Sequence, residues 1–66
     1  MSVDYFAIGD RIRASRKERE LSQKELADDC DLSVVHVSNI ENGNTKLSLG
    51  ALVDVAKVLI LHFLTS

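Results

Sequence analysis

The sequence contains no proline, only three glycines and a single cysteine. Proline and glycine are the residues that most often interrupt helices, so their scarcity favours helical structure. The sequence also lacks the alternating β-branched residues that are typical of strands. The lone thiol, Cys30, excludes an internal disulfide, and no second thiol or histidine stands at ligand spacing from it. The sequence therefore favours an all-helical fold without a structural metal site, and we expect Cys30 to be an inert, buried thiol at a helix end.

Long hydrophobic runs are scarce as well. The longest, VLILHFL at residues 58–64, is far shorter than a membrane-spanning helix, and no basic segment followed by an apolar stretch opens the sequence. We expect a cytoplasmic protein with no membrane partner. The 66 residues predict a single domain, 1–66, near the lower size limit at which a hydrophobic core alone supports a fold.

The charge is unevenly distributed along the chain. The formal net charge of −2 argues against a nonspecific nucleic-acid coat. One short segment nevertheless gathers five basic residues: Arg11, Arg13, Arg16, Lys17 and Arg19. The segment is either a basic binding face or a solvated helix face, and composition alone favours the solvated face.

Three short stretches, LSQKEL, LSVVHV and LSLGAL, share the pattern of a helix start. In each, a serine (Ser22, Ser33 or Ser48) can cap the helix between two apolar residues that pack across the cap, and Glu25 completes a capping box with Ser22. With an earlier helix at about 4–19, helical spacing predicts four helices. The first, 4–19, turns Tyr5, Ile8, Ile12 and Ser15 inward, and the second, 22–29, turns Leu26 and Ala27 inward. The third, 33–42, is ended by Gly43, and the fourth begins at 48 and buries Leu52, Val55, Ala56 and Leu59.

Only Cys30, Asp31 and Leu32 separate the second predicted helix from the third. So short a turn forces two helices to cross steeply, as in a helix-turn-helix, and we expect Asp31 to adopt positive φ. In the third helix Val37 and Ile40 form the inward stripe, with Val34 half-buried at its edge. Val35 is left facing outward with polar neighbours, a surface able to meet thymine methyls and base edges.

The stretch LSQKELADDCDLSVVHVSNIENG, followed by LSLGALVDVAKVL, resembles the Cro/cI-type (XRE-like) helix-turn-helix DNA-binding family. The resemblance covers about residues 8–59, and the Ser-Gln entry with the IENG exit makes it specific. It implies a compact bundle of four or five helices that binds palindromic operator DNA as a homodimer. A transcriptional regulator, acting as a repressor or autoregulator, is the function that it implies.

Carried over by position, the resemblance also implies individual roles. The helix at 33–42 would enter the major groove, with base contacts from Val34, Val35, His36, Ser38 and Asn39, among which Asn39 is the strongest because a carboxamide can bond adenine at two points. Arg16 and Glu41 would form an ion pair that ties the first helix to the end of the third. The DNA phosphate contacts would be Ser22, Gln23, Asn42, Asn44, Thr45 and Lys46.

The sequence departs from the family pattern in several places. Asp31 replaces the turn glycine, Ser15 replaces a core aliphatic residue, and Asp28 with Asp29 opposes the dipole of the second helix. After Leu59 the family usually begins a fifth helix, whereas here the fourth helix either continues or ends in a turn that folds back. We expect Leu61, Phe63 and Leu64 to bury in a homodimer interface, with filling of the chain's own core as the alternative.

Other functional classes have less support. The sequence shows no acid–base pair, nucleophile or phosphate loop, so we expect no enzyme, and neither a cofactor nor a small-molecule ligand is evident. His36 and His62 are too far apart to predict a shared metal. The rival interpretation is a protein-interaction module of helix-turn-helix fold, such as an antitoxin or the partner of an anti-repressor. The sequence does not distinguish activation from repression, nor a phage switch from a restriction-modification controller.

Overall fold

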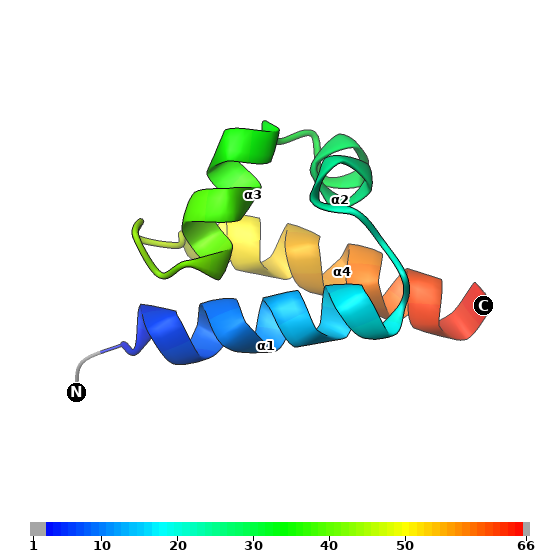
Figure 1. Ribbon diagram of the computed structural model, residues 1–66, viewed down its shortest axis with the longest axis horizontal. Helices are drawn as coiled ribbons and strands as arrows, with labels where there is room; N and C mark the ends of the chain where they lie inside the picture. The colour runs from blue at the N-terminus through cyan, green and yellow to red at the C-terminus, as the bar shows by residue number, and fades with distance from the viewer. Residues whose placement is uncertain (1–2, 66) are drawn as a thin grey trace.

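The computed structural model describes residues 3–65, which form four α-helices and no strand (Figure 1). The two long helices, α1 (Tyr5–Glu18) and α4 (Leu49–Thr65), run along the length of the molecule in the same direction. The two short helices, α2 (Gln23–Cys30) and α3 (Val34–Glu41), lie together on one side of them. The predicted all-α bundle with a helix-turn-helix is therefore confirmed.

Each predicted serine cap is present. The hydroxyls of Ser22, Ser33 and Ser48 accept hydrogen bonds from the backbone N–H three residues later, at 3.0, 3.1 and 3.1 Å. Asp4 caps α1 in the same way through the N–H of Ala7. A cap lies outside the helix that it starts, so the helices begin one residue after the predicted positions.

The core consists of apolar residues from all four helices and from the segment between α1 and α2. It confirms the predicted inward positions of Ile12, Leu26, Ala27, Val37, Ile40, Val55 and Leu59, and adds Leu21. Three predictions of burial were wrong, because Leu52 and Cys30 are only partly buried and Ala56 is exposed. Ala56 is exposed because it lies about 100° around α4 from Val55, beyond the core. Cys30 is only partly buried because it is the last residue of α2, where one side of the helix is open.

The connector between α2 and α3 has the predicted left-handed residue. Asp31 has φ of 57°, and its N–H donates to carbonyls of the last turn of α2. The N–H of Leu32 then donates to the Ala27 carbonyl at 2.8 Å, which closes the end of the helix. The chain can therefore leave α2 and start α3 within three residues, which fixes the steep crossing of the two helices.

Helix α4 resolves the alternatives left open for the last residues, because it continues to Thr65 instead of folding back. No proline or glycine follows Gly50 to stop it. As a result Leu61, Phe63 and Leu64 are all exposed, so filling of the chain's own core does not occur within residues 3–65. None of the helices in this range has the length and apolar content to span a membrane.

Candidate nucleic-acid interface

The start of α2 is a capping box, as predicted. The Ser22 hydroxyl accepts from the N–H of Glu25, and the Ser22 N–H donates to the Glu25 carboxylate, both at 3.0 Å. The N–H and hydroxyl of Ser22 hold the pKa of Glu25 below its ordinary value, so this carboxyl stays charged. Reciprocal bonding fixes the first turn of α2, whose remaining N–H groups and dipole favour an anion.

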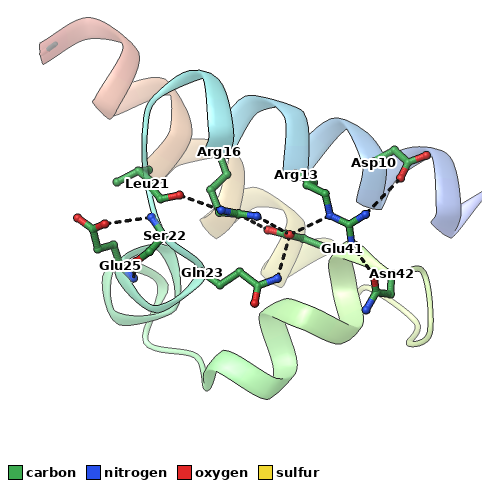
Figure 2. A network of polar contacts seen from close by, with 9 residues as sticks. All are labelled: Asp10, Arg13, Arg16, Leu21, Ser22, Gln23, Glu25, Glu41 and Asn42. Atoms are coloured by element: carbon green, nitrogen blue, oxygen red, sulfur yellow. Dashed lines mark hydrogen bonds and ion pairs between the residues drawn. The ribbon is translucent and has the colours of Figure 1, made fainter.

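Glu41, the last residue of α3, is the centre of a buried polar network (Figure 2). Its side chain is fully shielded from solvent, and Arg16 binds both of its oxygens, through Nε to Oε2 at 2.7 Å and through Nη2 to Oε1 at 3.1 Å. The third nitrogen of the guanidinium, Nη1, donates to the Leu21 carbonyl at 2.9 Å. The structure thus places Arg16 and Glu41, for which an ion pair was predicted, in direct two-point contact between α1 and α3.

Two further donors complete the coordination of the Glu41 carboxylate (Figure 2). Gln23 Nε2 donates to Oε1 at 3.1 Å, and Arg13 Nε donates to the same oxygen at 3.3 Å. Burial by itself would raise the pKa of Glu41, but the hydrogen bonds from Arg16 and Gln23, the Arg16 charge and the Arg13 bond together lower it below its ordinary value. Glu41 is therefore ionised at neutral pH, and it joins α1, α2 and α3 at one point.

This network also orients the carboxamide of Asn42. Arg13 Nη2 donates to Asn42 Oδ1, while another nitrogen of Arg13 lies 4.0 Å from Asp10 (Figure 2). Since the amide oxygen faces Arg13, the amide nitrogen is the atom that can donate to a further group. Gln23 and Asn42, both predicted phosphate contacts, are thus brought to the same network from the start of α2 and from the position after α3.

The outward side of α3 carries the predicted base-contact residues. Val35 is 70% exposed and Val34 is 40% exposed, whereas Val37 and Ile40 on the opposite side are buried. The remaining three predicted contacts, His36, Ser38 and Asn39, are half-buried and remain reachable from solvent. Successive residues of a helix point about 100° apart, so Val35 and Val37, which are two positions apart, point in nearly opposite directions.

The loop after α3 is held by Gly43, which has φ of +71°. Its N–H donates to the Ile40 carbonyl at 3.1 Å and the N–H of Asn44 donates to the Asn39 carbonyl at 2.9 Å, the pattern of a left-handed helix end. A side chain at Gly43 would also collide with Phe6. Three predicted phosphate contacts follow on this loop, of which Asn44 and Lys46 are exposed and Thr45 is half-buried.

The basic segment of α1 is only partly a solvated face. Arg13 and Arg16 turn toward Glu41, and Arg19 donates to the Leu59 and Ser15 carbonyls at 2.9 Å each. The solvated face suggested by composition therefore describes Arg11 and Lys17, which are exposed, but not the other three residues.

Sequence reasoning missed several of these contacts. Arg13 follows the same helical face as Arg16 at a spacing of three, a signal that could have placed both beside Glu41. No local pattern indicates that His62 Nε2 lies 2.9 Å from a carboxylate oxygen of Asp29, which joins α4 to α2. Arg19 likewise lies over the ring of Phe63, 5.2 Å from its centre.

Two further features concern metal binding and thiol chemistry within residues 3–65. No group of three or more His, Cys, Asp or Glu side chains in this range is placed to hold a metal ion. Burial raises the pKa of the Cys30 thiol, and Asp29 and Asp54 raise it further. A thiol that resists ionisation is a weak nucleophile, which agrees with the inert role expected of Cys30.

Comparison with known proteins gives two related findings. A family model described as helix-turn-helix matches residues 12–64. An uncharacterized HTH-type transcriptional regulator of Sinorhizobium fredii and an immunity repressor protein of Bacillus phage phi105 are each 42% identical to this chain over 52 residues, 79% of its length. The aligned part makes up 26% and 36% of these two relatives, so the chain spans about a third of their length or less. Together with the capping box, the three-residue connector and the Arg16–Glu41 pair, these matches show that the chain belongs to the Cro/cI-type (XRE-like) helix-turn-helix family of transcriptional regulators.

Proposed function

We propose that this chain is a sequence-specific DNA-binding regulator that acts as a repressor or autoregulator, with α3 in the major groove of a palindromic operator. The observation that carries the proposal is the arrangement around Glu41: one buried carboxylate fixes the start of α2 and the end of α3, while the outward side of α3 stays uncovered. A rigid frame beneath an accessible helix is what base readout requires. A relative named as an immunity repressor supports the same function.

The proposed roles separate base contacts from phosphate contacts. Val34, Val35, His36, Ser38 and Asn39 would face the base edges, and Asn39 would bond adenine through its carboxamide. Ser22 and Gln23 at the start of α2, with Asn42, Asn44, Thr45 and Lys46 after α3, would hold the backbone on either side of the groove. Backbone contacts fix the register of the protein on the duplex and carry little sequence information.

Gel-shift titration with DNA selected from a random library tests these roles. Asn39→Ala is expected to lose about 1–3 kcal/mol of discrimination at one base pair. Lys46→Ala is expected to weaken every site equally and to reduce the slope of log affinity against log salt by about 0.9. Lys17→Ala, at an exposed lysine of α1 outside the predicted contacts, serves as the charge-matched control. Equal loss on all sequences from the Asn39 and Lys46 changes would contradict the assignment.

A homodimer completes the proposal, since two-fold operators are matched by two-fold proteins. The exposed apolar residues near the end of α4, Leu61, Phe63 and Leu64, were predicted to form its interface, and their exposure on the single chain is compatible with that role. A selected sequence with two inverted half-sites would support the dimer. Sedimentation at micromolar concentration that shows monomer only would rule it out.

A protein-interaction module is the second candidate function. The observation that favours it is the exposed carboxylates of Asp28 and Asp31 at the end of α2 together with the exposed apolar side chains of α4. Absence of any DNA shift at low salt, with a copurifying protein partner, would support this candidate over DNA binding.

A further inference from the structure

The backbone at the end of α3 has few donors left for a phosphate. The N–H of Asn42 donates to the Ser38 carbonyl at 3.0 Å, and the N–H groups of Gly43 and Asn44 donate to carbonyls of the last turn of α3. These backbone donors are occupied because they close the helix. A hydrogen bond from Asn42 to a DNA phosphate must therefore come from its side chain.

The electrostatics at this end of α3 also oppose an anion. The carbonyl end of a helix carries a negative partial charge, and α3, Val34–Glu41, has no basic residue in its last turn. The start of α2 differs, because the N–H end of a helix attracts a phosphate by itself. At the end of α3, a favourable field for a phosphate has to come from a cation on another element.

Arg13 places such a cation here from α1 (Figure 2). Its three guanidinium nitrogens have three different neighbours: Nε donates to Glu41 Oε1 at 3.3 Å, Nη1 lies 4.0 Å from Asp10 Oδ1, and Nη2 donates to Asn42 Oδ1. The Arg13 side chain is 33% exposed, whereas the Glu41 side chain that it contacts is fully shielded. The guanidinium is thus held in place beside Asn42, and it would have to give up these contacts to reach a phosphate itself.

We propose that Arg13 is a positioning residue for DNA binding, which holds the Asn42 carboxamide with its nitrogen outward so that this nitrogen donates to a phosphate. Arginine has only N–H donors, so the amide can present only its oxygen to Arg13. Asn42 is exposed, and without this bond its carboxamide would be free to turn its oxygen toward the DNA, where it repels a phosphate. A group that is already oriented loses less entropy when the complex forms. This inference rests on the proposed function and specifies how one of its phosphate contacts is made.

The two arginines that contact Glu41 therefore have different roles. Arg16 is only 10% exposed and binds both carboxylate oxygens, so it holds α3 against α1. Arg13 makes one hydrogen bond to the same carboxylate and extends outward from it to Asn42 at the surface. Loss of Arg16 should act on folding, whereas loss of Arg13 should act mainly on the affinity for DNA.

A double-mutant cycle, measured by gel shift of the full chain on a duplex selected from a random library, tests this role. Asn42→Ala and Arg13→Met are each expected to weaken binding about tenfold, because both remove the same hydrogen bond to a charged group. In the Asn42→Ala background, Arg13→Met should weaken binding no more than Arg11→Met does. Arg11 is an exposed arginine of α1 with no predicted DNA contact, so Arg11→Met controls for the lost charge. Losses from the Arg13 and Asn42 changes that multiply in the double variant would show two independent contacts and overturn the proposal.

The sequence preference of the same variants separates positioning from a displacement of α3. Phosphate contacts carry little sequence information, so Arg13→Met should bind the selected duplex and a duplex with one changed base pair in the same ratio as the original chain. Circular dichroism checks that Arg13→Met remains helical. A changed ratio would show that α3 has moved on its frame, and that Arg13 acts on the fold and not on Asn42.

The side-chain amide of Asn42 gives a direct readout by heteronuclear NMR. Its NH₂ signals are identified as those missing from Asn42→Ala, and saturation with the selected duplex should shift them in the original chain but not in Arg13→Met. Equal shifts in both chains would show that Arg13 does not position the amide, and would overturn the proposal. No gel shift of any duplex by the original chain at low salt would refute the proposed function and this contact with it, whereas DNA binding with independent losses would refute the role of Arg13 alone.

Discussion

Arg16 and Glu41 meet through two hydrogen bonds, of 2.7 and 3.1 Å, where α1 and the end of α3 come together. Both side chains are almost entirely shielded from solvent, and every polar atom buried among the described side chains has a partner. A buried charge is expensive unless it is paired, so each residue depends on the other to remain in the interior. The pair therefore determines how α3 is held against the rest of the bundle.

Removal of one partner is expected to be costly. Arg16→Met would leave the Glu41 carboxylate buried without its main counter-charge, and we expect the free energy of unfolding to fall by about 3–5 kcal/mol. Arg13→Met removes a donor to the same carboxylate from a side chain that is one-third exposed, and we expect a loss below about 1 kcal/mol. Urea denaturation of both variants measures the difference. Equal losses would show that Arg16 is not the principal partner.

Acid should weaken the fold through the same carboxyl group. The folded-state pKa of Glu41 lies below its ordinary value of 4.5, so its contribution to stability is complete above that value and is lost as the pH falls through the lowered folded pKa. In this range the unfolded chain binds more protons, and the free energy of unfolding therefore decreases as the pH falls.

Urea denaturation at a series of pH values between about 6 and 2 measures this dependence. A Glu41→Gln variant should be less stable at neutral pH and should show a shallower decline in acid, because the titrating group is gone. Glu25→Gln is the comparison, since the pKa of Glu25 is also lowered but its side chain is exposed. If the free energy of unfolding falls as steeply in acid for Glu41→Gln as for the original chain, Glu41 is not the group responsible for the pH dependence.

Two glycines should respond to alanine in opposite ways. A methyl group on Gly9 would lie 2.4 Å from the Ile40 carbonyl oxygen and 2.6 Å from that of Glu41, so α1 and α3 would have to separate. A methyl group on Gly50 meets nothing within 4 Å. We expect Gly9→Ala to destabilise the protein by several kcal/mol or unfold it, and Gly50→Ala to stabilise it by up to about 1 kcal/mol. Thermal unfolding of the two variants checks both signs.

Local features of the fold were predictable because they depend on neighbouring residues. A serine placed between two apolar residues that pack across the cap sufficed to locate the starts of α2, α3 and α4, and the left-handed Asp31 followed from the length of the connector. The end of α4 was left open because no stop signal follows Gly50. Nothing in local sequence marks where a helix ends when it has neither a cap nor a breaker.

The partners within the candidate site were harder to predict than its positions. The resemblance suggested Arg16 for Glu41, but the two other donors, Arg13 and Gln23, lie 28 and 18 residues from it and meet it only through the crossing of three helices. The Asp29–His62 contact spans 33 residues in the same way. Ala56 was misplaced because its helical position lies at the boundary between the buried and the exposed side of α4, where composition does not decide.

Two residues with left-handed backbone provide a final test of the balance between local strain and turn geometry. Asp31 has φ of 57° and Glu20 has φ of 56°, a conformation that costs a side chain roughly 1 kcal/mol and that glycine adopts without strain. We expect Asp31→Gly to raise the free energy of unfolding by about 0.5–1 kcal/mol, since it also removes a negative charge from the end of α2. Glu20 stands at the equivalent position after α1, where its N–H and that of Leu21 bond to the last turn of that helix. Arg16 and Lys17 in this turn offset the Glu20 charge, so Glu20→Gly relieves the same strain and should gain less. Urea denaturation at low and high salt separates the two contributions, because only the charge effect is screened. A loss of stability in Asp31→Gly would show that the aspartate stabilises the turn by more than its backbone strain costs.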